Sequence, residues 1–190
     1  MLDTSGSMDA KSWDIEKNFV KDLVKSLKMS PSGGHAAVTL FSSAANLEIK
    51  FSDHTSFNTF EAAVNGLPKA NGGTRIDIGM DVAEKQMFNP ANGMRPSAAK
   101  SLLLITDGTN NVPLKDMRGP FRARKIKIIV IGAGNVNKAE LEKLVDDPKD
   151  LHIASSMEAL KMGKLFKDVG EGLCDGMPYF ICKRYFDRFI

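Results

Sequence analysis

Residues 101–108, SLLLITDG, decide the fold class of this chain. An apolar run closed by Asp107-Gly108 is typical of a strand that is buried on both faces of a parallel sheet. Residues 127–131, KIIVI, are followed by Gly132-Ala-Gly134 and have the same character. Elsewhere the apolar period switches repeatedly between helical and extended spacing, which is typical of an α/β fold built around a mostly parallel sheet.

The remaining elements follow from the same two periods. Apolar residues three and four apart predict helices, and short apolar runs predict strands. We expect helices at 11–28, 57–67, 76–88, 116–125, 138–145 and 157–172, and further strands at 36–42, 46–51 and 151–154. A short polar turn joins the strands at 36–42 and 46–51, so these two are expected to form a hairpin.

Length and composition restrict the classes of function. The chain has 190 residues, 43% of them hydrophobic and 26% charged, which fits one globular unit and excludes a disordered or coiled-coil chain. The net charge of +3 is too small to indicate nucleic acid or an anionic membrane as the main partner. The sequence contains no run of about 18 apolar residues, the length that a membrane-spanning helix needs. Scattered histidines and the absence of a CxxC pair argue against a zinc enzyme.

Oxygen-bearing side chains gather in the loops that follow the predicted strands. Asp3, Ser5 and Ser7 alternate, so a tight loop can turn all three inward, while Thr74 and Asp107 follow at later loops. In open parallel sheets, ligands bind beyond the carboxyl ends of the strands, where such loops meet. Oxygen donors suit a hard divalent cation, and the sequence therefore predicts a site for Mg²⁺ or Mn²⁺.

The charge of this site indicates binding and not catalysis. Only Asp3 and Asp107 are anionic, so a bound dication would still demand a negative oxygen, which a carboxylate of another molecule can supply. No histidine, lysine or cysteine stands in these loops to act as a general base. We therefore expect a non-catalytic module that recognises acidic groups.

Asp3-Thr4-Ser5-Gly6-Ser7, Gly72-Gly73-Thr74 and Ile105-Thr106-Asp107-Gly108 together resemble the metal-ion-dependent adhesion site of the von Willebrand factor A domain family. The resemblance covers about residues 2–174 and implies a doubly wound, Rossmann-like sheet flanked by helices. It implies that Ser5 and Ser7 are direct metal ligands, that Asp3 and Asp107 often act through water, and that Thr74 binds the metal in the ligand-bound state.

The resemblance also implies a partner and a compartment. Similar domains of adhesion receptors and matrix proteins capture a partner's Glu or Asp, so we expect a secreted protein and an extracellular protein ligand, such as a collagen-like or other matrix protein. Side chains around the metal rim, such as Met8, Arg75, Thr109 and Asn110, are expected to set specificity.

The chain departs from the family at its start. Members carry an apolar strand before DxSxS, and here only Met1-Leu2 remain, which predicts a truncated central strand, an unfilled apolar slot and a Met1 that is not the natural start. Cys174 stands where extracellular members often carry a cysteine that pairs with one before that strand. The expected organisation is a domain over 1–174 and a tail over 175–190 for which no period fits.

Several alternatives remain at this point. Asp3–Ser7 can be a helix-capping turn, and the basic residues from Arg118 to Lys127 can form a heparin-like patch or a solvated helix face. Cys174 and Cys182 can be free thiols or a local bridge. The domain can serve as an intracellular scaffold or bind without metal, and Asp-Thr-Ser-Gly with Asp107-Gly108 loosely resembles an aspartic-type hydrolase, whose folds are all-β.

Overall fold

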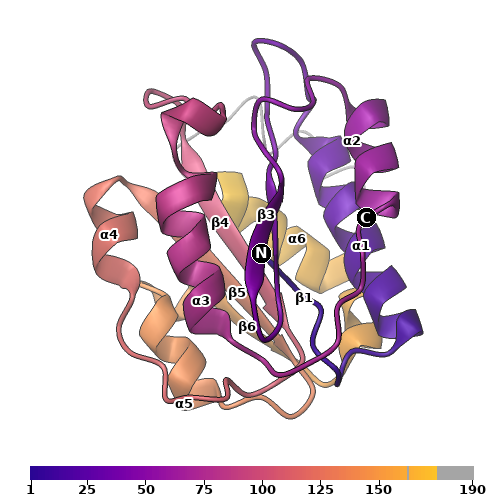
Figure 1. The fold of residues 1–190 in the computed structure, drawn as a ribbon, viewed down its shortest axis with the longest axis vertical. Coiled ribbons are helices and arrows are strands. Elements are labelled where there is room, and N and C mark those ends of the chain that lie inside the picture. The colour runs from indigo at the N-terminus through magenta and orange to yellow at the C-terminus, as the bar shows by residue number, and fades with distance from the viewer. Residues whose placement is uncertain (162, 175–190) are drawn as a thin grey trace.

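The computed structural model describes residues 1–161 and 163–174. Six strands form one sheet in the order β3-β2-β1-β4-β5-β6 (Figure 1). Their bounds are β1 Leu2–Asp3, β2 Val38–Phe41, β3 Ala45–Ile49, β4 Lys100–Thr106, β5 Ile126–Ala133 and β6 Leu151–Ala154. The hairpin pair β2 and β3 is antiparallel, and every other neighbouring pair is parallel. The predicted doubly wound, mostly parallel sheet is confirmed.

Helices cover both faces of this sheet. Their bounds are α1 Ala10–Ser26, α2 Phe57–Asn65, α3 Ile76–Val82, α4 Arg118–Ala123, α5 Lys138–Leu141 and α6 Gly163–Cys174. Helices α1, α2 and α6 lie on one face, and α3, α4 and α5 lie on the other (Figure 1). Alternate residues of the central strands feed the two resulting cores, so Ile129 packs with the first group and Val130 with the second. None of the helices in the described part of the chain has the length and apolar character needed to span a bilayer.

Three predicted helices end or change type earlier than expected. The helix predicted over 76–88 continues beyond α3 as a π-helical turn at Ala83–Met87. The one predicted over 138–145 becomes a 3₁₀ turn at Glu142–Leu144 after α5. The one predicted over 157–172 is a 3₁₀ segment at Met157–Lys161 followed by α6 from Gly163.

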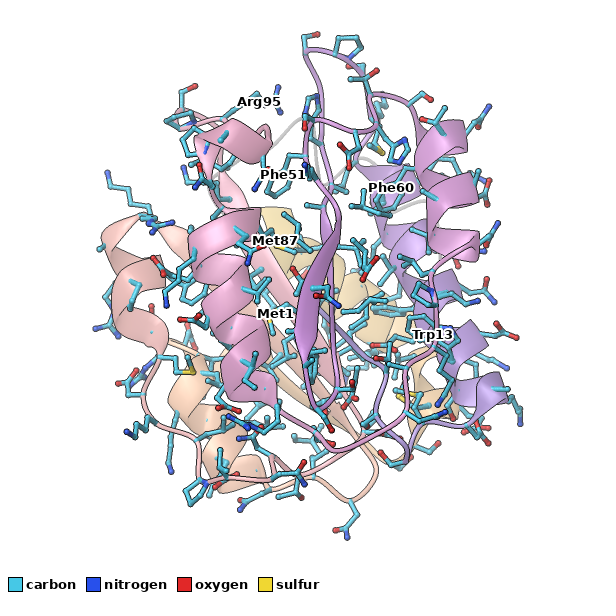
Figure 2. The ribbon with its side chains drawn as sticks, in the orientation of Figure 1. Met1, Trp13, Phe51, Phe60, Met87 and Arg95 are labelled. Carbon is cyan, nitrogen blue, oxygen red and sulfur yellow. The ribbon has the colours of Figure 1, made fainter. Side chains whose placement is uncertain are left out.

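The central strand β1 is two residues long, whereas its neighbour β4 has seven. Leu2 pairs with Leu40 of β2 and with Ile105 of β4, and the α-amino group of Met1 donates to the carbonyl oxygen of Leu103 at 2.7 Å. Met1 lies in the middle of the molecule, with Phe51 and Arg95 further toward one end of the sheet (Figure 2).

A cavity adjoins Met1 and Leu2 at the amino-terminal side of β1. This cavity of about 120 Å³ is also lined by segments 36–38 and 101–103 together with Leu173. An adjoining cavity of about 640 Å³ is lined by residues that include Phe51 and Arg95. The side chains of Cys174 and Cys182 and the predicted tail at 175–190 lie outside the described residues.

Candidate metal site at the carboxyl edge of the sheet

Asp3 ends β1 and holds the following loop in shape. It is fully buried, and one carboxylate oxygen accepts a hydrogen bond from the backbone N–H of Ser5 at 2.8 Å. Its other oxygen accepts from the hydroxyl of Thr106 at 2.6 Å, which ties β1 to β4. Burial raises the pKa of the Asp3 carboxyl above its ordinary value, and the hydrogen bonds from Thr106 and Ser5 oppose this rise.

Ser5 and Ser7 bring their hydroxyl groups together above Asp3. Their Oγ atoms are 3.0 Å apart, and Ser7 Oγ donates to Asp107 Oδ1 at 2.7 Å. This contact spans 100 positions of sequence, because β1 and β4 are parallel neighbours whose carboxyl ends lie at the same edge. Ser7 is exposed and Asp107 is half-buried, so both can reach a ligand from solvent.

Thr74 approaches the same point from the loop before α3. A Cβ placed on Gly108 would lie 2.9 Å from Thr74 Oγ1 and 3.7 Å from Ser7 Oγ, so only a residue without a side chain fits between these groups. Asn111 fixes Thr74, because its side-chain oxygen accepts from the Thr74 N–H at 2.6 Å and its own N–H donates to the Thr74 carbonyl at 2.8 Å. All five residues predicted from the sequence therefore converge at one edge of the sheet.

Glu16 is a buried carboxyl behind the site that the sequence did not reveal. It projects from α1 and accepts from the backbone N–H of Asp3 at 3.1 Å through Oε1. Its Oε2 has no hydrogen-bond partner among the described residues. Burial, with a smaller contribution from the charge of Asp3, raises the pKa of Glu16 well above its ordinary value. Burial therefore disfavours a charge on Glu16.

The donor set fits a hard divalent cation. It consists of hydroxyl and carboxylate oxygens, and such oxygens are the ligands that Mg²⁺ and Mn²⁺ prefer. Within 1–161 and 163–174, no three or more His, Cys, Asp or Glu side chains form a cluster that could hold a metal ion. Asp3 and Asp107 are the two carboxylates among the five candidate ligands, so this site is poor in negative charge.

Two of the residues expected at the metal rim lie elsewhere. Met8 is 1% exposed and packs in the core against α1, because the chain turns inward after the loop. Asn110 is also buried, and its side-chain oxygen accepts from the N–H of Ile76 at 2.6 Å. Arg75 forms a bidentate ion pair with Asp77, and Thr109 is exposed.

The capping alternative for the loop Asp3–Ser7 is wrong. The residue that caps α1 is Asp9, whose carboxylate accepts from the N–H of Ser12 at 2.6 Å. Four residues of the basic run have acidic partners. The pairs are Arg118 with Asp116, Arg122 with Asp146, Arg124 with Glu84 and Lys127 with Asp150. The helices on both faces also exclude the all-β fold of the aspartic-type hydrolases.

A parallel sheet with helices on both faces and oxygen-bearing loops at its carboxyl edge defines a class of α/β ligand-binding domains. Within that class, this chain belongs to the von Willebrand factor type A domain family, whose family model matches residues 1–168.

Relatives and solved structures agree with this assignment. The chain is 25% identical over 177 residues to matrilin-1 of Bos taurus, covering 92% of the chain and 32% of matrilin-1. It is 25% identical over 165 residues to the collagen alpha-1(XX) chain of Homo sapiens, covering 87% of the chain and 13% of that collagen. The chain therefore spans a third or less of these two relatives.

Proximal thread matrix protein 1 of the mussel byssus has the same fold, with a TM-score of 0.83 and 25% identity over 91% of this chain and 46% of that one. A second structure of the mussel protein, described as having a zinc-occupied MIDAS motif, aligns with a TM-score of 0.80 and 27% identity, covering 88% of this chain and 43% of that one.

Proposed function

We propose that this domain is a divalent-metal-dependent protein-binding module of the extracellular matrix. The observation that carries the proposal is the convergence of Ser5, Ser7, Thr74 and Asp107 around one point, with Asp3 buried beneath them. Relatives among matrilins and collagens support a role in the matrix and a secreted location. A partner of matrix type, such as a collagen, is the ligand class that these relatives favour.

In this proposal Mg²⁺ or Mn²⁺ is the resident ion, held by the hydroxyl groups of Ser5 and Ser7. Asp3 and Asp107 supply negative charge beside the ion, and Thr74 becomes a further metal ligand in the ligand-bound state. A bound dication supplies a positive centre that attracts a carboxylate from the partner. The zinc-occupied motif of the mussel protein supports a divalent ion in this type of site.

The proposed module has no catalytic task. The side chains that meet at the site are hydroxyl groups and two carboxylates, and within the described residues their hydrogen bonds include none to a histidine or cysteine side chain. The hydroxyl of Ser7 donates to the carboxylate of Asp107, which is itself a candidate metal ligand. Binding without turnover is therefore the function that the geometry supports best.

The experiment that tests this proposal measures metal and ligand binding separately. Titration of the metal-free protein with Mn²⁺ should show one site, and Asp107→Asn should weaken it by at least about tenfold, or ~1.4 kcal/mol. Asp22→Asn, which removes an exposed carboxylate of α1 away from the loops, is the matched control and should leave the affinity unchanged. Fibrillar collagen in a solid-phase assay then tests the partner. Binding that persists unchanged in excess EDTA would refute the metal mechanism.

A further inference from the structure

A lysine lies beside the candidate metal loop. Lys69 belongs to the segment between α2 and α3, and its ammonium group donates to the carbonyl oxygen of Ser5 at 3.4 Å. It also donates to Asn71 Oδ1 at 2.9 Å and to the carbonyl oxygen of Ala70 at 3.4 Å. All three acceptors are neutral. Among the residues that the structure describes, no carboxylate forms a salt bridge with Lys69.

This arrangement differs from that of the other basic side chains near the site. Arg75, which follows Thr74 directly, has its charge matched by Asp77. Arg118 and Arg122 of α4 are matched by Asp116 and Asp146. Lys69 therefore contributes a positive charge to the rim of the site that the protein itself does not balance.

Metal binding changes the net charge of the site around the ammonium group of Lys69. Asp3 and Asp107 are the two carboxylates of the candidate site, and a dication offsets their two negative charges. Lys69 then leaves the loaded site with one net positive charge. Without the ion the same ammonium group donates to the carbonyl oxygen of Ser5 and contributes to holding the loop. The positive excess therefore arises only when a metal is bound.

We propose that Lys69 is a second anchor for the acidic group of the partner. This inference rests on the proposed function, because it assigns a contact to the carboxylate that the metal captures. The two long bonds of Lys69, both 3.4 Å, are weak, and its flexible side chain can exchange them for an ionic contact with the incoming carboxylate. Lys69 thus favours an acidic ligand over a neutral amide of the same shape.

The proposal predicts two opposite effects of one substitution. Lys69→Gln removes a positive charge near the dication, so the affinity for Mn²⁺ alone should rise by about twofold to fivefold. The same substitution should weaken carboxylate binding to the loaded protein by about threefold to fivefold. Lys69→Arg keeps the charge and should stay within about twofold of the original protein in both measurements.

The chain offers a matched control at the other end of the sheet. Lys100 also donates only to neutral carbonyl oxygens, those of Pro96 and Ala98. It begins β4, whereas Asp107 follows the end of that seven-residue strand, so the two lie about 20 Å apart. Lys100→Gln should therefore change neither affinity.

The test uses the full chain and two probes. Calorimetric titration gives the affinity for Mn²⁺, and acetate, the smallest mimic of a glutamate side chain, is then titrated into the Mg²⁺-loaded protein while backbone amide shifts of the site loops are followed by NMR. Tighter metal binding together with weaker acetate binding in Lys69→Gln supports the proposal. Loss of both affinities would show that Lys69 only shapes the loop, and unchanged values would show that it has no part; either result overturns it. Acetate that leaves the loaded original protein unperturbed would instead refute the proposed function.

Discussion

Two buried threonines, Thr39 of β2 and Thr106 of β4, allow a direct test of what holds the metal loop in place. Thr106 and Thr39 are both fully buried. The hydroxyl of Thr106 donates to Asp3 at 2.6 Å and accepts from the N–H of Gly108 at 3.2 Å. The hydroxyl of Thr39 has no hydrogen-bond partner among the described residues. Replacement by valine removes one hydroxyl from each position at nearly constant volume.

The two replacements should change stability in opposite directions. Hydrogen bonds to a charged group contribute about 1.5–3 kcal/mol, so Thr106→Val should lower the free energy of unfolding by about 2 kcal/mol. Thr39→Val removes a buried hydroxyl that lacks a partner and should raise it by up to about 1 kcal/mol. For a domain of this size the difference of about 3 kcal/mol corresponds to melting temperatures that differ by roughly 6–12 °C.

The assay is urea unfolding at neutral pH in EDTA, so that no ion contributes. Thr106→Ser restores the hydroxyl and should recover most of the loss, which separates the hydrogen bond from strand packing. Equal stability of Thr106→Val and Thr39→Val would refute the reasoning, because it would mean that the contact to Asp3 adds nothing to the fold.

Two further predictions concern packing and pH. Gly79→Ala should destabilise the fold by about 1–3 kcal/mol, because its Cβ would lie 2.6 Å from Met1 and 3.1 Å from Phe41, whereas Gly119→Ala, whose Cβ meets nothing within 4 Å, should be neutral or stabilising; chemical denaturation distinguishes them. Burial lowers the pKa of His152, so the unfolded chain takes up a proton first as the pH falls below about 6.5. The original protein should therefore lose more stability between pH 7 and 5.5 than His152→Gln, and parallel pH profiles from thermal melts would contradict this.

The elements that the sequence predicted best are those in which one period governs a whole segment. The apolar run at 101–106 became β4 at Lys100–Thr106, because a strand buried on both faces needs apolar residues at every position. The split of the helix predicted over 157–172 could not be read from periodicity, since the 3₁₀ segment and α6 share the same apolar stripe and both contact α1.

The candidate site divides in the same way. Its five predicted residues share a rule that sequence can apply, because each stands in a loop at the carboxyl edge of the sheet. Glu16 could not be found, since a glutamate on an amphipathic helix is usually solvated, and only the packing of α1 on β1 buries it. Met8 was misplaced because proximity to the loop in sequence does not reveal that its side chain turns into the core. Lys69 follows no period, and its place depends on how the segment before α3 crosses the loop after β1.

The two-residue strand β1 lies between the β2–β3 hairpin and the strands β4, β5 and β6. We call this junction, from which the metal loop starts, the seam of the sheet. Leu2 and Asp3, with backbone hydrogen bonds of Met1 and Thr4, join the β2–β3 hairpin to the ladder of β4, β5 and β6, so amide hydrogen exchange across the sheet should be fastest along this line. Ser5 and Ser7 stand on the β1 side of the seam, and Asp107 stands on the β4 side. An ion held by these groups would bridge the seam, and its arrival should slow exchange in the hairpin as well as in the loops. Ligand capture and the mechanical integrity of the sheet would then depend on the same few atoms.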